Sequence, residues 1–228
     1  MGNDILGTST SYRGTAQGDS SVSFTLLAGV NRILFICTSA LHPTVERNAS
    51  GIQYGGQAAT VLHTLTKSEV GEGKWNNVVA FILEADLPAI GAHNATATYN
   101  GSVTNGHRIS VFCIEDATQE TPPVAIGDAG FILAQNHYED DITVATAGDT
   151  IFGKCAPQGG APFTENSGQT EFAVHSAGDP DHTFTYKDGQ AAGAQEQKWT
   201  YTAVDWHCVQ LWTVTPLNIP TGSIPIMF

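Results

Sequence analysis

Short apolar runs recur along the chain, and Gly, Asn, Asp or Ser residues separate each run from the next. The runs are rich in β-branched and aromatic residues, which favour strands. They lie at residues 22–27, 32–37, 78–83, 95–99, 108–114, 141–145, 183–186 and 207–214. Because almost no segment has the periodicity of an amphipathic helix, the pattern predicts an antiparallel sandwich or barrel.

The length of 228 residues fits one all-β domain, since such domains often reach about 200–250 residues. Hydrophobic residues make up 41% of the chain, enough for a sizeable core. Residues 1–20 are polar and rich in Gly, Ser and Thr, which predicts an N-terminal arm. Residues 21–216 then form the domain, and residues 217–228 a C-terminal arm. The sequence shows no domain linker and no clear internal repeat.

The C-terminal arm begins after Pro216, which ends the last strand pattern. It is apolar, carries no charged side chain and contains spaced prolines, which forbid a regular helix or a central strand. An apolar arm exposed to water would be a liability. We therefore expect it to lie in a groove, on its own domain or, as we favour, on another subunit. The residues expected at that contact are Leu217, Ile219, Ile224, Ile226 and Phe228.

The net charge is −13, from 22 acidic and 9 basic residues, and the basic residues are scattered singly. Such a surface repels nucleic acid, so we expect no DNA or RNA partner. The N-terminus has no secretory signal pattern, and no stretch approaches the roughly 18 apolar residues of a membrane span. We expect a soluble product of a cytoplasm, with no membrane partner.

The cysteines Cys37, Cys113, Cys155 and Cys208 are far apart and have no CxxC spacing. Three of them lie inside apolar runs, which favours buried thiols over a disulfide that joins two sheets. Other mid-run residues are expected in the same core. The predicted core set is Phe35, Cys37, Val111, Cys113, Leu211 and Trp212.

Catalytic patterns are missing from the sequence. It has no Gly-x-Ser-x-Gly, no His-Glu-x-x-His, no phosphate-binding loop and no dinucleotide fingerprint. Two acidic segments, 139–141 and 179–182, could offer oxygen ligands to Ca²⁺, but neither has the order of a dedicated loop. We interpret both as solvated turns and expect no enzyme activity, no cofactor and no metal.

The tryptophans allow two interpretations. Trp206 and Trp212 lie six residues apart in one strand pattern, and period 2 places them on one face. With Trp75 and Trp199 they could form a platform on which a sugar ring stacks. Burial in the core is the commoner role for such residues, and we favour it.

Several segments resemble a jelly-roll-type β-sandwich module of tailed-bacteriophage virion proteins, which also occurs in bacterial surface proteins. The resemblance rests on residues 31–37 (NRILFIC), 52–60 (IQYGGQAAT), 81–88, 95–99, 109–114 and 205–216. It spans roughly residues 20–216, and its motifs are packing motifs. It implies a single antiparallel, jelly-roll-like β-sandwich with extended terminal arms.

The resemblance implies a non-enzymatic virion protein, made in the host cytoplasm. A capsid decoration (cement) protein comes first, and a tail or head-fibre component second. The implied partners are the major capsid protein or other virion proteins, and further copies of the chain, with a homotrimer favoured. The alternative is a carbohydrate-binding or adhesin module that recognises a cell surface.

Overall fold

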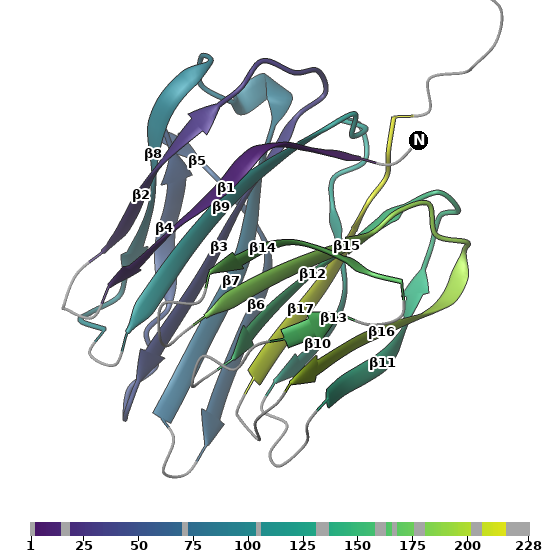
Figure 1. The fold of residues 1–228 in the computed structure, drawn as a ribbon. Helices are drawn as coiled ribbons and strands as arrows, with labels where there is room; N and C mark the ends of the chain where they lie inside the picture. Colours follow the sequence, from purple (N-terminus) through teal and green to yellow (C-terminus); the bar gives the residue numbers. More distant parts are fainter. Residues whose placement is uncertain are drawn as a thin grey trace, which may run out of the picture.

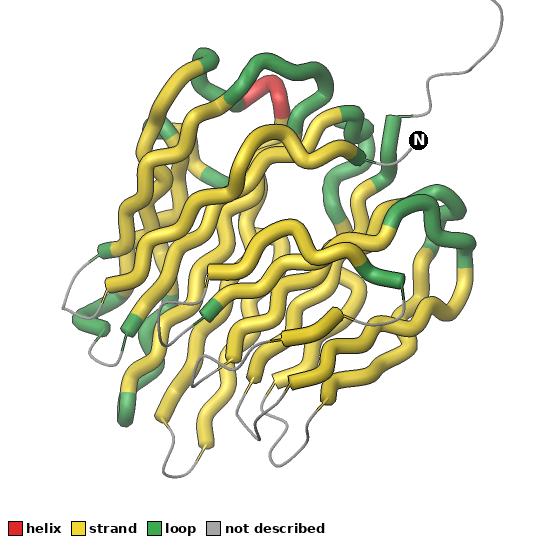
Figure 2. Tube along the Cα trace, viewed as in Figure 1, coloured by secondary structure: helices red, strands yellow, loops and turns green. Residues whose placement is uncertain are grey.

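The computed structural model describes residues 3–14, 19–69, 73–103, 106–130, 137–157, 163–165, 168–175, 181–201 and 207–217. Within these residues the regular structure consists of strands and one short 3-10 turn, η1 (Glu84–Asp86). The tube in Figure 2 is strand through most of its length. The predicted all-β, antiparallel sandwich architecture is therefore confirmed.

The first nine strands form what we call the N-terminal unit. They are β1 (Asp4–Gly14), β2 (Ser20–Leu26), β3 (Ile33–His42), β4 (Ala49–Tyr54), β5 (Gln57–Ala58), β6 (Thr60–Glu69), β7 (Gly73–Leu83), β8 (Gly91–Tyr99) and β9 (His107–Glu115). The remaining strands form the C-terminal unit. They are β10 (Val124–Gly130), β11 (His137–Val144), β12 (Thr150–Pro157), β13 (Phe163–Glu165), β14 (Thr170–His175), β15 (His182–Lys187), β16 (Gly193–Tyr201) and β17 (His207–Val214).

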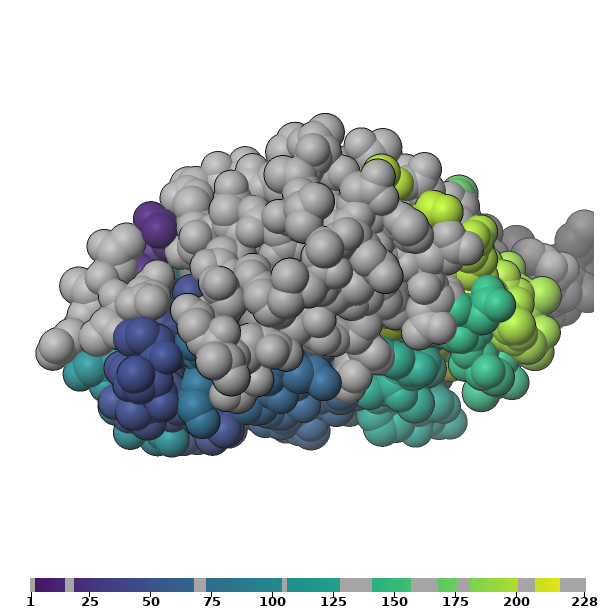
Figure 3. Space-filling view, turned by 90° about the horizontal axis from the view of Figure 1, so that it is seen from below, coloured from purple at the N-terminus to yellow at the C-terminus, as the bar shows by residue number. Residues whose placement is uncertain are grey.

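The described strands build four stacked sheets (Figure 1). From one side of the molecule to the other, the strand orders are β2-β8-β4-β5, β1-β9-β3-β7-β6, β10-β17-β12-β15-β14 and β11-β16-β13. Each unit contributes one outer and one inner sheet, and the two inner sheets pack against each other. In the space-filling view of Figure 3, the N-terminal unit gathers at one end and the C-terminal unit at the other.

The continuous apolar runs are explained by this stack. All residues of β3 are buried, and alternate side chains point to opposite faces of its sheet. Leu34 and Ile36 enter the core of the N-terminal unit, whereas Phe35 and Cys37 enter the core between the units. A strand that is covered on both faces needs apolar residues at successive positions. The six predicted core residues are all buried, which confirms that part of the sequence analysis.

The two units share one strand topology. Phe35 pairs with Phe112 where β3 meets β9, and Phe152 pairs with Trp212 where β12 meets β17. Starting from these two pairs, each residue pair between β3 and β9 has a counterpart at the same distance along β12 and β17. A bulge also occurs at equivalent positions in the two units. In the N-terminal unit it lies in β6 next to the residue that pairs with Val79, and in the C-terminal unit it lies in β14 next to the residue that pairs with Phe184. We therefore treat residues that share a register position as equivalent.

The inner sheets pack about a pseudo-two-fold axis. The ring of Phe35 lies 5.5 Å from that of Trp212, and the equivalent rings of Phe152 and Phe112 are 6.1 Å apart. Phe35 and Phe152, which are equivalent to each other, are 6.0 Å apart. This reciprocity is the geometry of an isologous contact, here made between two halves of one chain.

The expected N-terminal arm is wrong for residues 4–14, because these form β1. This strand pairs with β9 from Asp4 to Gly14, with a shift between Leu6 and Thr10. Polar residues suit this position because β1 is the edge strand of its sheet and several of its side chains remain accessible. Residues 1–2 and 15–18 lie outside the described part of the chain.

Candidate functional site

A gathering of buried polar side chains lies between the two inner sheets, beside the aromatic part of the same interface. We call it the inter-unit cluster. Its members come from both units: Ser39, His63, Asn77, Arg108 and Ser110 from the first, and Lys154, Asp181, His182 and Gln210 from the second.

Lys154 crosses from β12 into the N-terminal unit. Its Nζ donates to the backbone oxygen of Thr38 at 2.9 Å, to Asn77 Oδ1 at 3.2 Å and to Gln210 Oε1 at 3.3 Å. These three acceptors use the three hydrogens of the ammonium group. The side chain is fully buried, and burial lowers the pKa of Lys154 to about 8.

His182 is held from both sides by residues of the N-terminal unit. Its Nε2 lies 2.7 Å from Ser39 Oγ, and its Nδ1 lies 2.8 Å from Ser110 Oγ. Ser39 donates its hydroxyl hydrogen to Asn77, so it accepts from Nε2–H, and Nδ1 then accepts from Ser110. The neutral ring is thereby satisfied. Burial first, and the charges of Lys154 and Arg108 second, hold the pKa of His182 well below its ordinary value.

Arg108 and Asp181 form a buried ion pair at the edge of the cluster, with Nη2 and Oδ1 3.3 Å apart. The interpretation of segment 179–182 as a solvated turn is therefore wrong for Asp181 and His182, which are buried at the start of β15 and face β9. Asp179 and Pro180 lie outside the described residues. Segment 139–141 is not a turn either, because it lies inside β11.

Chemically, the inter-unit cluster joins the units. Most of its bonds cross from one unit to the other, and its groups are enclosed between two sheets. Two of the crossing bonds are related by the pseudo-two-fold axis: Ser110 contacts His182, and the equivalent Gln210 donates to the backbone oxygen of Asn77 at 3.3 Å. Buried polar groups with satisfied bonds fix one register of packing and penalise others.

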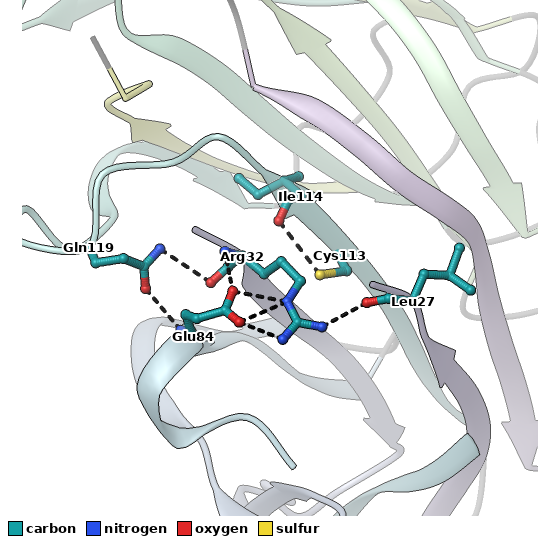
Figure 4. A network of polar contacts seen from close by, with 6 residues as sticks. All are labelled: Leu27, Arg32, Glu84, Cys113, Ile114 and Gln119. Carbon is teal, nitrogen blue, oxygen red and sulfur yellow. Dashed lines mark hydrogen bonds and ion pairs between the residues drawn. The ribbon is translucent and has the colours of Figure 1, made fainter. Parts of the chain in front are cut away.

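A second polar network ties the start of β3 to η1 (Figure 4). Arg32 Nε donates to Glu84 Oε2 at 2.9 Å, and the backbone N–H of Arg32 donates to the same oxygen at 2.7 Å. Gln119 connects both residues, since its Nε2 donates to the Arg32 carbonyl and its Oε1 accepts from the Glu84 N–H. The ion pair lowers the pKa of Glu84.

A surface groove of about 340 Å³ lies between β1 and β2. Its lining residues are Gly7, Thr8, Thr10, Ser23, Thr25 and Leu27. The hydroxyls there can bond an uncharged polar group, but the lining supplies no titratable side chain for acid–base chemistry. Among the described residues, no three His, Cys, Asp or Glu side chains gather in a way that could hold a metal ion.

The outer sheets of the two units differ in charge. None of the residues in β2, β4, β5 and β8 is Asp, Glu, Lys or Arg. In the C-terminal unit, Asp141 and Glu196 pair across β11 and β16 and are both exposed. The whole chain follows this division: residues 1–117 have nine acidic and six basic side chains, a net charge of −3, while residues 118–228 have thirteen and three, a net of −10.

Of the residues predicted to contact another subunit, Leu217 is described. Its backbone N–H donates to the Asp116 carbonyl at 2.6 Å, next to the bridge between Ala117 and Pro216. The arm therefore starts where the two units join. Ile219, Ile224, Ile226 and Phe228 lie outside the described residues.

The predicted tryptophan and cysteine roles can also be placed. Trp75, Trp199 and Trp212 are buried, so they form no sugar platform at the surface, and Trp206 lies outside the described residues. All four cysteines are buried free thiols, as favoured from the sequence. Burial raises the pKa of Cys37 to about 12, which keeps this thiol protonated and unreactive.

Sequence reasoning missed the inter-unit cluster. The available signals were a lysine inside the apolar run 151–155 and two asparagines, Asn76 and Asn77, at the start of another. A search of protein families and one of curated proteins each found no match for this chain. No helix in the described residues is long and apolar enough to cross a membrane.

Proposed function

We propose that the chain is a non-enzymatic structural protein of a bacteriophage virion, made in the host cytoplasm. Its first role is capsid decoration, and its second candidate location is a tail or head fibre. The partners are the major capsid protein or other virion proteins and further copies of the chain, with three copies favoured. Its mechanism is mechanical: a rigid block carries arms and faces that join neighbouring subunits.

The observation that carries this proposal is the stack of two sheet pairs, whose inner sheets are joined by buried aromatic and polar side chains. The orders β1-β9-β3-β7 and β2-β8-β4-β5 divide the strands between two sheets in the manner of a jelly roll, and β10-β17-β12-β15 repeats the first order. Jelly rolls are common in viral capsid and lectin domains. Fold alone does not set function. The proposal therefore also rests on the inter-unit cluster, whose ionisable side chains are buried between the two inner sheets and hold these sheets together.

The arm supports the same proposal. Its first residue, Leu217, lies beside the junction of the two units, and the sequence continues with eleven uncharged residues that include two prolines. An extended arm of this length can supply a good part of the roughly 1,200–2,000 Å² that a stable interface buries.

The test is deletion of residues 218–228, which keeps the hydrogen bond from Leu217 to Asp116. We expect the truncated protein to fold but to lose assembly or capsid binding in a sedimentation assay. A full-length variant with Ile219, Ile224, Ile226 and Phe228 replaced by Ser separates length from apolar contact, and it should fail in the same way. Normal assembly and binding by both variants would overturn the role of the arm.

A further inference from the structure

The outer face of the N-terminal unit has no Asp, Glu, Lys or Arg in its strands, on a strongly acidic protein, and at one edge Thr98 Oγ1 donates to the Asp19 carboxylate at 3.5 Å. We call it the neutral face and define it by the outward side chains of three strands: Ser21, Ser23, Thr25, Gln53, Ala92, Asn94, Thr96 and Thr98. These side chains are short and lie in cross-strand rows, such as Ser23 opposite Asn94 and Ser21 opposite Thr96. The result is a sheet surface of small hydroxyl, amide and methyl groups.

The equivalent face of the C-terminal unit provides an internal comparison. Leu26 pairs with Gly91 at the end of β2, and Val144 pairs with Gly193 at the end of β11. Both glycines have positive φ, at 138° and 110°. Counting back from these ends, Ser23 and Asn94 correspond to Asp141 and Glu196. One fold position therefore holds an acidic pair in one unit and an uncharged pair in the other, so the strand geometry does not require the uncharged residues.

We infer that the neutral face pairs with the neutral face of a second copy of this chain, in an isologous two-fold contact. The argument for this occupant is electrostatic. Two copies that each carry −13 repel each other over most approaches, and the repulsion is strongest between C-terminal units, where −10 resides. Contact through the neutral faces covers no charged residue of β2, β4, β5 or β8, with the Asp19 carboxylate at one edge, and places the two acidic units at opposite ends of the pair.

The strands of the face supply most of the area that such a contact needs. At about 4.8 Å between strands and about 3.3 Å per residue, the seven, nine, six and two residues of β2, β8, β4 and β5 cover roughly 380 Å² of flat sheet. Two such faces give about 760 Å², so the flanking side chains must supply the rest of the roughly 1,000 Å² of a specific interface. Apolar side chains extend the area at one end, since Leu27 and Ile90 directly follow and precede the Leu26–Gly91 pair and are both exposed.

This pairing is independent of the arm and of the proposed virion role. If arms assemble three copies, face-to-face pairing gives six; if arms assemble none, it gives two. The number of copies in the intact protein is therefore even. Deletion of residues 218–228 and alteration of the neutral face consequently test different contacts.

The experiment transfers the acidic pair of the C-terminal unit to the neutral face, as Ser23→Asp with Asn94→Glu. The matched control makes the reverse change, Asp141→Ser with Glu196→Asn. Sedimentation equilibrium of the full chain measures the mass, and circular dichroism checks the fold. We expect an even number of copies for the unaltered chain, half that number for the Ser23→Asp, Asn94→Glu variant, and no change for the control.

The single variant Ser23→Lys covers the case in which the double variant fails to fold, and it should also halve the mass. An odd copy number in the unaltered chain, a single copy included, overturns the inference, and so does an unchanged mass in both neutral-face variants. A neutral-face variant that keeps its mass but no longer binds capsids also overturns it, because the occupant of the face is then the shell.

Discussion

The N-terminal and C-terminal units differ most at positions that their common strand pairing makes equivalent. At the interface between the units, Cys37 corresponds to Lys154 and Asn77 corresponds to His182. On the outer sheets, Ser23 corresponds to Asp141. In each of these pairs the C-terminal unit supplies the ionisable or more basic group. The same backbone thus supports two different surfaces, and side-chain chemistry divides the roles.

The unlike residues at the interface explain how the two inner sheets pack against each other in one register. An interface of identical halves would place like groups near the axis, two lysines or two histidines, which repel when charged. Here one side supplies the cation, Lys154, and the other side supplies acceptors on Thr38 and Asn77. The asymmetry lets buried polar groups satisfy each other, while the aromatic part of the interface keeps its symmetry.

The largest expected effect tests whether the two units form one cooperative structure. Phe35→Ala and the equivalent Phe152→Ala each remove a fully buried ring from the shared core, and each should lower the free energy of unfolding by about 3–5 kcal/mol. Urea denaturation followed by circular dichroism should give a single transition for both variants. Two transitions, of which each variant shifts one, would show that the units unfold separately.

The shared core was predictable because apolar runs identify buried strands whatever their partners. Phe35 and Trp212 follow from such runs. The four-layer arrangement was not predictable in this way, since a continuous apolar run indicates burial on both faces without naming what covers the second face. The repeat did leave a trace: Gly91-Ala92 and Thr98-Tyr99 recur as Gly193-Ala194 and Thr200-Tyr201. Four identities in nine residues are too few to establish a repeat without the strand pairing.

The inter-unit cluster could not be predicted because its members come together through tertiary packing. Ser39 and His182 are 143 residues apart, and Lys154 meets Asn77 across 77 residues. In the sequence, His182 beside Asp181 resembles a polar turn, and its burial depends on strands from the other unit. Local pattern assigns an isolated polar residue to the surface, and that rule fails where two sheets share a polar interior.

The next prediction concerns acid and uses two histidines of the C-terminal unit, one of which, His182, corresponds to Asn77 in the N-terminal unit. Burial, with the positive charges of Arg108 and Lys154 nearby, depresses the pKa of His182, and burial with Arg108 lowers that of His175 to about 4. The unfolded chain binds protons near pH 6.5, so it gains protons before the folded chain does. Stability is then fully present above pH 6.5 and falls as pH drops toward 4.

We expect His182 alone to contribute a loss of about 2 kcal/mol between pH 6.5 and pH 5, since each pH unit in which only the unfolded histidine is protonated contributes about 1.4 kcal/mol. Urea denaturation at several pH values measures it. His182→Gln, which cannot become charged, should flatten this slope even though it lowers stability at pH 7.5. Asp181 is the acidic group that faces this site, through its pair with Arg108. An equal slope in the variant would show that His182 is not the responsible group.

The smallest expected effect compares the two units at the same end of their inner sheets. There, Arg32 and Glu84 form an ion pair in the N-terminal unit, whereas Thr150 Oγ1 donates to Asp188 Oδ1 at 2.9 Å in the C-terminal unit. Glu84→Gln should cost about 1 kcal/mol at pH 7, because the carboxylate is partly accessible to water and the pair is screened.

The cost of Glu84→Gln should shrink below about pH 4.5. Arg32 lowers the pKa of Glu84, so the pair stabilises the folded chain above the unfolded value and loses that effect as the carboxylate takes up a proton. Thr150→Val keeps the shape of the side chain and removes one hydrogen bond, at a cost of about 1 kcal/mol or less. If Thr150→Val costs more than Glu84→Gln at neutral pH, the neutral donor in the C-terminal unit is the stronger of the two ties, and the ion pair contributes mainly by orienting η1 against β3.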